Sequence, residues 1–236
     1  MEIAEVYVVD QYRHEFKYEL DCGSAVSIES RLGLLTSRDP HAAANGSYTI
    51  RSLYFDDYND SSFWENESGT EPREKFRLRI YNDDPSFIQL ELKRKDHEMT
   101  LKLTQAVPAA FCQKILSGRG ISFDDTGDSA LLRKFWLQQE MRNLHPCVLV
   151  EYERTPYVCP EGNVRITFDR NMRGSSCWEN FLTGEALMRP IMPIGRELME
   201  VKYDQFLPDT IAHTISVRRL HRTAFSKYYL CRRFIG

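Results

Sequence analysis

The sequence predicts an α+β protein built on a largely antiparallel β-sheet that closes into a barrel. Three observations support this. Eight segments alternate polar and apolar residues with period two, short reversals join several of them, and charged residues gather on one side of the alternation. At 236 residues, with no repeat and no Gly/Ser-rich linker, the chain fits a single domain spanning residues 1–236.

The elements follow from periodicity and turn residues. Asn82-Asp83-Asp84-Pro85 and Lys95-Asp96-His97-Glu98 indicate tight reversals, because Asn, Asp and Pro favour turn geometry. Strands are expected over Tyr12–Leu20, Tyr48–Asp56, Lys75–Tyr81, Phe87–Lys95, Met99–Lys102, Val148–Tyr157, Val164–Asp169 and Glu197–Tyr203. Helices are expected over Ser24–Thr36, Val107–Leu116, Ser129–Asn143, Gln205–Ile215 and Ala224–Arg232.

Positive charge is concentrated on one face of the strands. Lys75, Arg77 and Arg79 alternate with apolar residues, so their side chains share one face. For a single strand, an open sheet with one wet face is the simpler interpretation. Repeated cation clusters on several strands are costly unless an anion completes them. A closed sheet would place the charged faces around a lumen and the apolar faces outward, beneath helices.

Such a lumen suits phosphate, which arginine binds bidentately. The carboxylates that share the charged faces, Glu15, Glu91 and Glu200, could hold a divalent cation, since oxygen ligands suit Mg²⁺ and Mn²⁺. From the alternation alone, the cations Arg13, Lys75 and Lys95 are also expected to bind phosphate.

Several function classes are excluded. The net charge of −3 argues against a general nucleic-acid binder, and no GxxxxGK[ST] motif indicates a P-loop. The six cysteines are scattered without a CxxC pair, which favours reduced thiols over a zinc site. No apolar run approaches the roughly 20 residues of a membrane helix, and no signal peptide is evident. A cytoplasmic protein is therefore expected.

Eight segments in order resemble a known family. They are RHEFKYEL, RSLYFDD, KFRLRIY, ELKRK, VEYERTPY, VRITFDRN, LMEVKYD and FSKYYL. From about Arg13 to Leu230 this succession is similar to the vacuolar transporter chaperone (VTC) domain, whose members are polyphosphate polymerases of the triphosphate tunnel metalloenzyme superfamily. The resemblance implies an antiparallel barrel forming a tunnel, transfer of the γ-phosphate of ATP onto a phosphate chain, and a divalent metal, Mn²⁺ or Mg²⁺.

The resemblance also implies roles for individual residues. Glu200 would be the metal-binding carboxylate, and Lys227 with Ser226 would lie in a carboxy-terminal helix that plugs one end of the tunnel. Lys227, Arg77 and Arg79 are the expected catalytic residues. The expected tunnel cations that clamp triphosphate and product are Lys17, Arg51, Arg77, Arg79, Lys93, Lys102, Arg154 and Arg165.

One departure bears on the reaction. Tunnel phosphatases carry an ExExK signature near the amino terminus, whereas this chain has Arg13-His14-Glu15-Phe16-Lys17. The loss of the first carboxylate favours polymerisation over hydrolysis. A tunnel triphosphatase and a non-catalytic polyphosphate-binding module remain the alternatives. A separate membrane partner and the oligomeric state are left open.

Overall fold

All eight predicted strands are present in the computed structural model, which describes residues 9–39, 46–216 and 220–235. They are β1 (Val9–Asp21), β3 (Tyr48–Asp56), β4 (Arg73–Tyr81), β5 (Asp84–Asp96), β6 (Met99–Val107), β7 (His145–Cys159), β8 (Val164–Ser175) and β10 (Arg196–Tyr203). Most extend beyond the predicted bounds. Two-residue strands β2 (Ser37–Arg38) and β9 (Arg189–Pro190) were not predicted, because two residues show no period.

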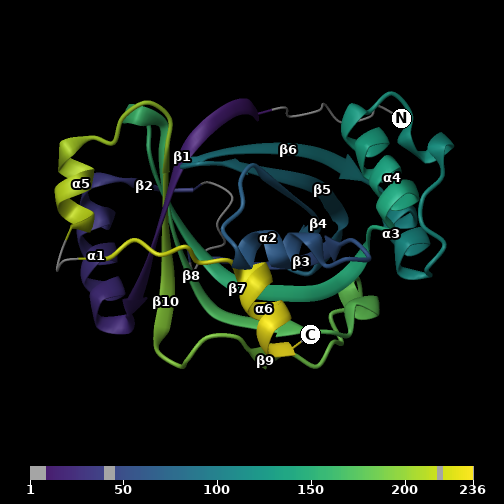
Figure 1. Ribbon diagram of the computed structural model, residues 1–236. Coiled ribbons are helices and arrows are strands. Elements are labelled where there is room, and N and C mark those ends of the chain that lie inside the picture. Colours follow the sequence, from purple (N-terminus) through teal and green to yellow (C-terminus); the bar gives the residue numbers. More distant parts are fainter. Residues whose placement is uncertain (1–8, 40–45, 217–219, 236) are drawn as a thin grey trace.

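The eight long strands close into an antiparallel barrel (Figure 1). They neighbour one another in the order β7, β3, β4, β5, β6, β1, β10, β8, and β8 pairs back with β7 along most of its length. The short strands β2 and β9 extend β7 and β8 at the rim. The fold class predicted from the alternation is therefore confirmed.

The helices are α1 (Cys22–Leu35), α2 (Ser61–Glu67), α3 (Ala109–Leu116), α4 (Ala130–Arg142), α5 (Asp209–Ile215) and α6 (Lys227–Ile235). The five predicted helices correspond to all of these except α2, whose only apolar residues, Phe63 and Trp64, are adjacent and show no helical period. Instead, α2 begins where carboxylates accept its first amide N–H groups. Asp56 accepts from the amides of Ser62 and Phe63, at 2.8 and 3.1 Å, and Asp57 from that of Ser61, at 2.9 Å.

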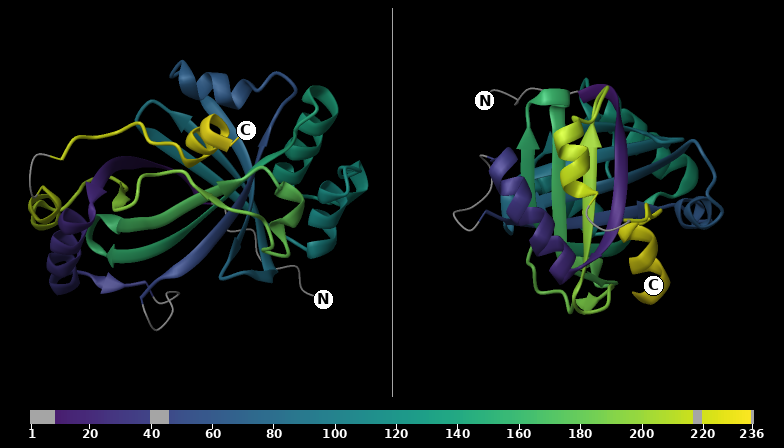
Figure 2. Two further views of the ribbon diagram at one scale, coloured as in Figure 1. Left: turned by 90° about the horizontal axis from the view of Figure 1, so that it is seen from below. Right: turned by 90° about the vertical axis from the view of Figure 1, so that its left-hand side faces the viewer.

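Helices cover the barrel at two opposite sides (Figure 2). Apolar faces of the strands pack beneath them. Phe76, Leu78 and Leu90 pack with residues of α3 and α4 into one apolar cluster. Ile166 and Val201 pack with residues of α1 and α5 into a second cluster. With the apolar faces turned outward, the polar faces of the same strands are turned inward.

A third cluster joins α6 to the inner wall of the barrel. Tyr228 and Cys231 of α6 pack with Val150, Tyr152 and Leu198 of β7 and β10. The carboxy-terminal helix therefore closes part of the barrel interior, as predicted. Within the described ranges, no helix combines the length and apolar character needed to cross a membrane.

Candidate functional site

A cavity of about 400 Å³ lies inside the barrel. Among the described residues, thirteen lysines and arginines line this central cavity, against only two carboxylates, Glu15 and Glu200. The cations come from seven of the eight barrel strands and from α6: Arg13, Lys17, Arg73, Lys75, Arg77, Arg79, Lys93, Lys95, Lys102, Arg154, Arg165, Lys202 and Lys227. The rest of the wall includes several tyrosines and residues 223–226.

The structure brings together at this wall every phosphate-binding candidate named from the sequence except Arg51, and Ser226 is among them. Strand register explains the grouping. Lys75 pairs with Lys93 across β4 and β5, and Lys93 pairs in turn with Lys102 of β6. Directly opposed residues point to the same face of a sheet, so these cations meet inside the barrel.

Arg51 is a correction to the prediction. On β3 the side chains of Tyr48, Ile50 and Tyr54 line the cavity, so Arg51 points to the other face. Its guanidinium group pairs there with the Glu151 carboxylate at 2.7 Å. The resemblance was the basis for this prediction. Alternation could not test it, because both faces of β3 carry apolar residues.

Glu91 has a different role from the expected metal ligand. It is fully buried and does not line the cavity. Its oxygens accept from Arg77 at 2.7 Å and Lys102 at 3.0 Å, and Arg79 lies 3.6 Å away. Burial alone would raise the pKa of Glu91, but these three cations hold it well below its usual value. Glu91 is thus the counter-charge that fixes two cavity arginines.

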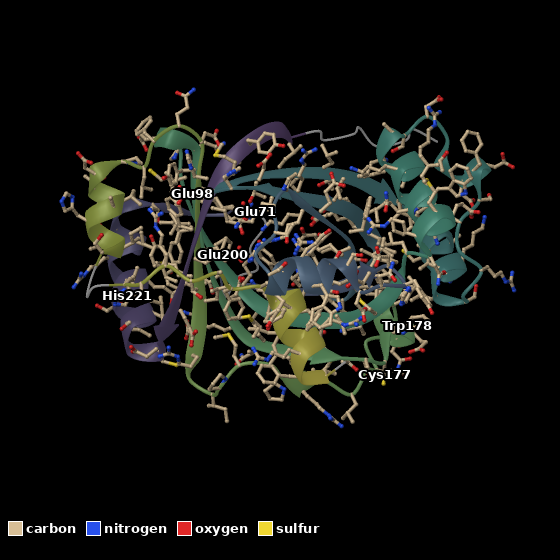
Figure 3. All side chains as sticks on the ribbon, viewed as in Figure 1. Glu71, Glu98, Cys177, Trp178, Glu200 and His221 are labelled. Carbon is tan, nitrogen blue, oxygen red and sulfur yellow. The ribbon has the colours of Figure 1, made fainter. Side chains whose placement is uncertain are left out.

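Two carboxylates and two lysines alternate in sign across β1 and β10 and form a charge cluster. Lys17 lies opposite Glu200, and Glu15 lies opposite Lys202. The Glu15 carboxylate is 3.3 Å from the Lys17 ammonium and 2.7 Å from that of Lys93. Despite burial, the surrounding lysines hold the pKa of Glu15 and of Glu200 well below the usual range. Figure 3 shows Glu200 in the middle of the barrel, close to the start of α6.

Lys227, the first residue of α6, adds a third lysine to this charge cluster. Its ammonium group lies 2.6 Å from Asp169 and 3.0 Å from Glu200. Arg154 holds the same Asp169 carboxylate with two hydrogen bonds, at 2.6 and 2.7 Å. Although burial disfavours the charge on Lys227, the two carboxylates raise its pKa above the usual value.

Sequence reasoning missed several residues of this site. On β10, Lys202 lies on the same face as Glu200, and on β8, Asp169 lies on the same face as Arg165. The alternation that indicated Glu200 and Arg165 therefore also indicated Lys202 and Asp169. Arg73 lies just before the predicted start of β4. The cavity tyrosines were not predicted either, since most aromatic residues in the sequence alternate with charged ones and were therefore expected on the apolar, core side of the strands.

The cavity carboxylates could hold a divalent cation only together with phosphate oxygens of a bound ligand. Within residues 9–39, 46–216 and 220–235, no three His, Cys, Asp or Glu side chains gather as a metal cage. Glu15 and Glu200 both reach the cavity wall, and both already contact lysines. Mg²⁺ is commonly held by one or two carboxylates plus phosphate oxygens and water, so these residues fit a metal that arrives with phosphate.

Comparison with known proteins gives a family match. The chain matches the family model described as VTC domain over residues 12–235. A search of the curated proteins finds no match.

Solved structures with a similar arrangement include the PH1012 protein from Pyrococcus horikoshii OT3, with 12% identity, a TM-score of 0.49, and coverage of 95% of this chain and 99% of that chain. The PH1819 protein from the same organism has 13% identity, a TM-score of 0.47, and coverage of 94% and 98%. The Mimivirus capping enzyme triphosphatase has 13% identity, a TM-score of 0.36, and coverage of 86% of each chain.

Proposed function

The chain belongs to the VTC domain family, and from this premise we propose that it is a polyphosphate polymerase that transfers the γ-phosphate of ATP onto a polyphosphate chain in the central cavity. The family match covers nearly the whole chain and confirms the resemblance seen in the ordered motifs.

The observation that supports this proposal best is the charge of the cavity wall. Thirteen cations face the cavity in the described part of the chain, and only two carboxylates face it with them. Seven carboxylates lie within 4.0 Å of these thirteen cations in the described part of the chain, so positive charge remains in excess, and a bound polyanion would neutralise it. A linear phosphate chain fits, because it carries charge along its whole length and the cations surround the cavity rather than forming one patch.

Phosphoryl transfer requires mainly positioning and neutralisation of charge, and little covalent chemistry from the protein. Arg79 is suited to this role. Its guanidinium donates to Ser52 Oγ and to the Tyr152 hydroxyl, both at 3.2 Å, and Glu91 fixes its neighbour Arg77. Both guanidinium groups are therefore oriented before a ligand arrives, so little reorganisation is needed when charge develops on the phosphate.

Lys227 and Glu200 are the proposed reaction-side residues. The Lys227 ammonium would move from its carboxylate partners to the transferred phosphate and neutralise its charge. Glu200, with Glu15 beside it, would hold Mn²⁺ or Mg²⁺ together with phosphate oxygens. The metal, when bound, supplies further charge neutralisation.

The proposal implies ATP and polyphosphate as ligands, a divalent cation as cofactor, and the cytoplasm as the place where ATP is met. Nucleic acid is not a proposed ligand. A membrane protein that receives the product is compatible with the proposal but is not required by it.

Incubation of the purified protein with ATP and Mn²⁺ tests the proposal. We expect ADP and long phosphate chains, resolved by gel electrophoresis. Glu200→Gln should stop chain growth. Lys114→Met, which removes a surface pair with Asp125, should leave it unchanged. Release of orthophosphate from tripolyphosphate without chain growth would identify a triphosphatase instead. Binding without turnover under several metals would identify a binding module.

A further inference from the structure

Lys75 differs from every other cation of the central cavity. Among the residues that the structure describes, twelve of the thirteen cavity cations have a carboxylate oxygen within 4.0 Å, and Lys75 has none. Its ammonium group instead donates to Asn66 Oδ1 at 2.9 Å and lies 4.6 Å from the centre of the Tyr228 ring. Both partners are neutral, so they orient the amine without compensating its charge.

Three cations, two carboxylates and two neutral side chains face Lys75. They are Arg73 on the same strand, Lys93 on β5, Lys17 on β1, Asp56 on β3, and Glu65 with Asn66 on α2, beside Tyr228 on α6. The Asp56 carboxylate is already occupied by amides of α2 and by the Tyr228 hydroxyl. Burial, and then the positive neighbours, lower the pKa of Lys75 to about 7.

We propose that Lys75 is the anchoring subsite for one phosphate group of the bound polyanion, and that the Lys75 amine takes up a proton from solution when this group binds. The inference rests on the proposed function for the class of ligand, a linear phosphate chain. At the other cavity cations, an arriving phosphate competes with a carboxylate already in contact. At Lys75 it displaces none, so the full attraction between ammonium and phosphate is available.

The location of this subsite follows from its partners. Asn66 belongs to α2 and Tyr228 to the first turn of α6, so the anchor lies where these two helices reach the cavity. Lys227 immediately precedes Tyr228 in the chain. A phosphate held at Lys75 would therefore lie on the side of the cavity next to the first turn of α6.

Calorimetric titration with tripolyphosphate, without metal, near pH 8 tests the proposal. Comparing two buffers with very different ionisation enthalpies gives the number of protons taken up on binding. Burial also lowers the pKa of Lys93 to about 7, so the Lys75 proton is measured as a difference. We expect the unaltered protein to take up about one proton more per bound tripolyphosphate than Lys75→Arg, because a Lys75 amine with this lowered pKa is mostly neutral at that pH. Lys75→Arg should keep the affinity and lose that proton, because guanidinium stays charged.

Affinity gives a second readout. Lys75→Met should weaken tripolyphosphate binding at least about tenfold. Lys95→Met, a matched change on β5 at a lysine paired with Glu71, should weaken it less. The free Lys75→Met protein should also melt at a higher temperature near pH 8, because folding no longer has to remove the proton from a lysine that is charged in the unfolded chain.

Unchanged proton uptake in Lys75→Arg, or equal affinity losses in the two methionine variants, would overturn the proposal. These outcomes are separate from the polymerase assay. A protein that binds tripolyphosphate with the expected proton uptake but makes no phosphate chains keeps its anchor at Lys75 and loses only the proposed activity.

Discussion

The ammonium nitrogen of Lys227 lies 2.6 Å from a carboxylate oxygen of Asp169, and both side chains are buried. Asp169 also accepts two hydrogen bonds from Arg154. The contact joins the first residue of α6 to strand β8 of the barrel. The charged pair therefore serves two purposes. It holds the closing helix in place, and, in the proposed function, it keeps a cation beside Glu200 for the arriving ligand.

Replacing Lys227 by Met should destabilise the free protein by about 3–5 kcal/mol, because Asp169 and Glu200 would remain buried with one cation fewer. Chain growth should fall by about a hundredfold or more, as expected when a preorganised charge is removed from a transfer site. Urea unfolding and the ATP assay measure the two effects. Lys134→Met, which breaks a surface pair with Glu74, should cost no more than about 1 kcal/mol. Equal losses of stability in both variants would contradict this account.

Arg51 and Arg79 lie on neighbouring strands and should respond differently to the same change. Arg51→Met should lower the free energy of unfolding, because it leaves Glu151 with only Arg173 as its cationic partner, and should leave tripolyphosphate affinity unchanged. Arg79→Met should lower the affinity, because Arg79 lines the cavity. A similar loss of affinity in both variants would show that the outer face of β3 contributes to ligand binding.

The strands and the barrel could be predicted because period-two alternation is a direct consequence of strand geometry. The charges of Lys75, Arg77 and Arg79 fixed which face of β4 is polar, and closure followed from the cost of leaving such faces without an anion. Lys202 lies on a face already identified by Glu200, so a stricter use of parity would have found it.

Other features depend on tertiary contacts that no local pattern carries. Helix α2 begins where the carboxylates of Asp56 and Asp57 accept hydrogen bonds from its first backbone amides. These contacts leave no periodic pattern in the sequence, so the helix could not be predicted. Glu91 and Glu200 both alternate into the interior, yet only the three-dimensional packing places Glu91 behind the arginines and Glu200 at the cavity wall. The side of Arg51 depends on the register of β3 against β7.

Removing metal should separate binding from transfer. Without Mn²⁺, tripolyphosphate should still bind, because the cavity cations are present in the protein itself. Adding Mn²⁺ should strengthen binding in the unaltered protein. In Glu200→Gln this metal-dependent gain should be lost, while metal-free binding should be as tight or tighter, since a carboxylate no longer competes for Lys227 and Arg154. The same metal-dependent gain in Glu200→Gln would remove Glu200 from the metal site.

Acid should destabilise the protein in part through Glu91. Arg77, Arg79 and Lys102 hold the pKa of Glu91 in the folded protein well below its ordinary value of about 4.5, so the stabilising contribution of Glu91 is present above about pH 4.5 and is lost as the pH falls through the folded pKa. Glu91→Gln should lower the free energy of unfolding near pH 6 by about 3–5 kcal/mol, because Arg77 and Arg79 lose their buried counter-charge. Between about pH 6 and 3 the variant should lose less stability than the unaltered protein, and the two curves should converge. Denaturant unfolding at a series of pH values measures this. Parallel curves would show that the Glu91 carboxylate keeps an ordinary pKa in the folded protein.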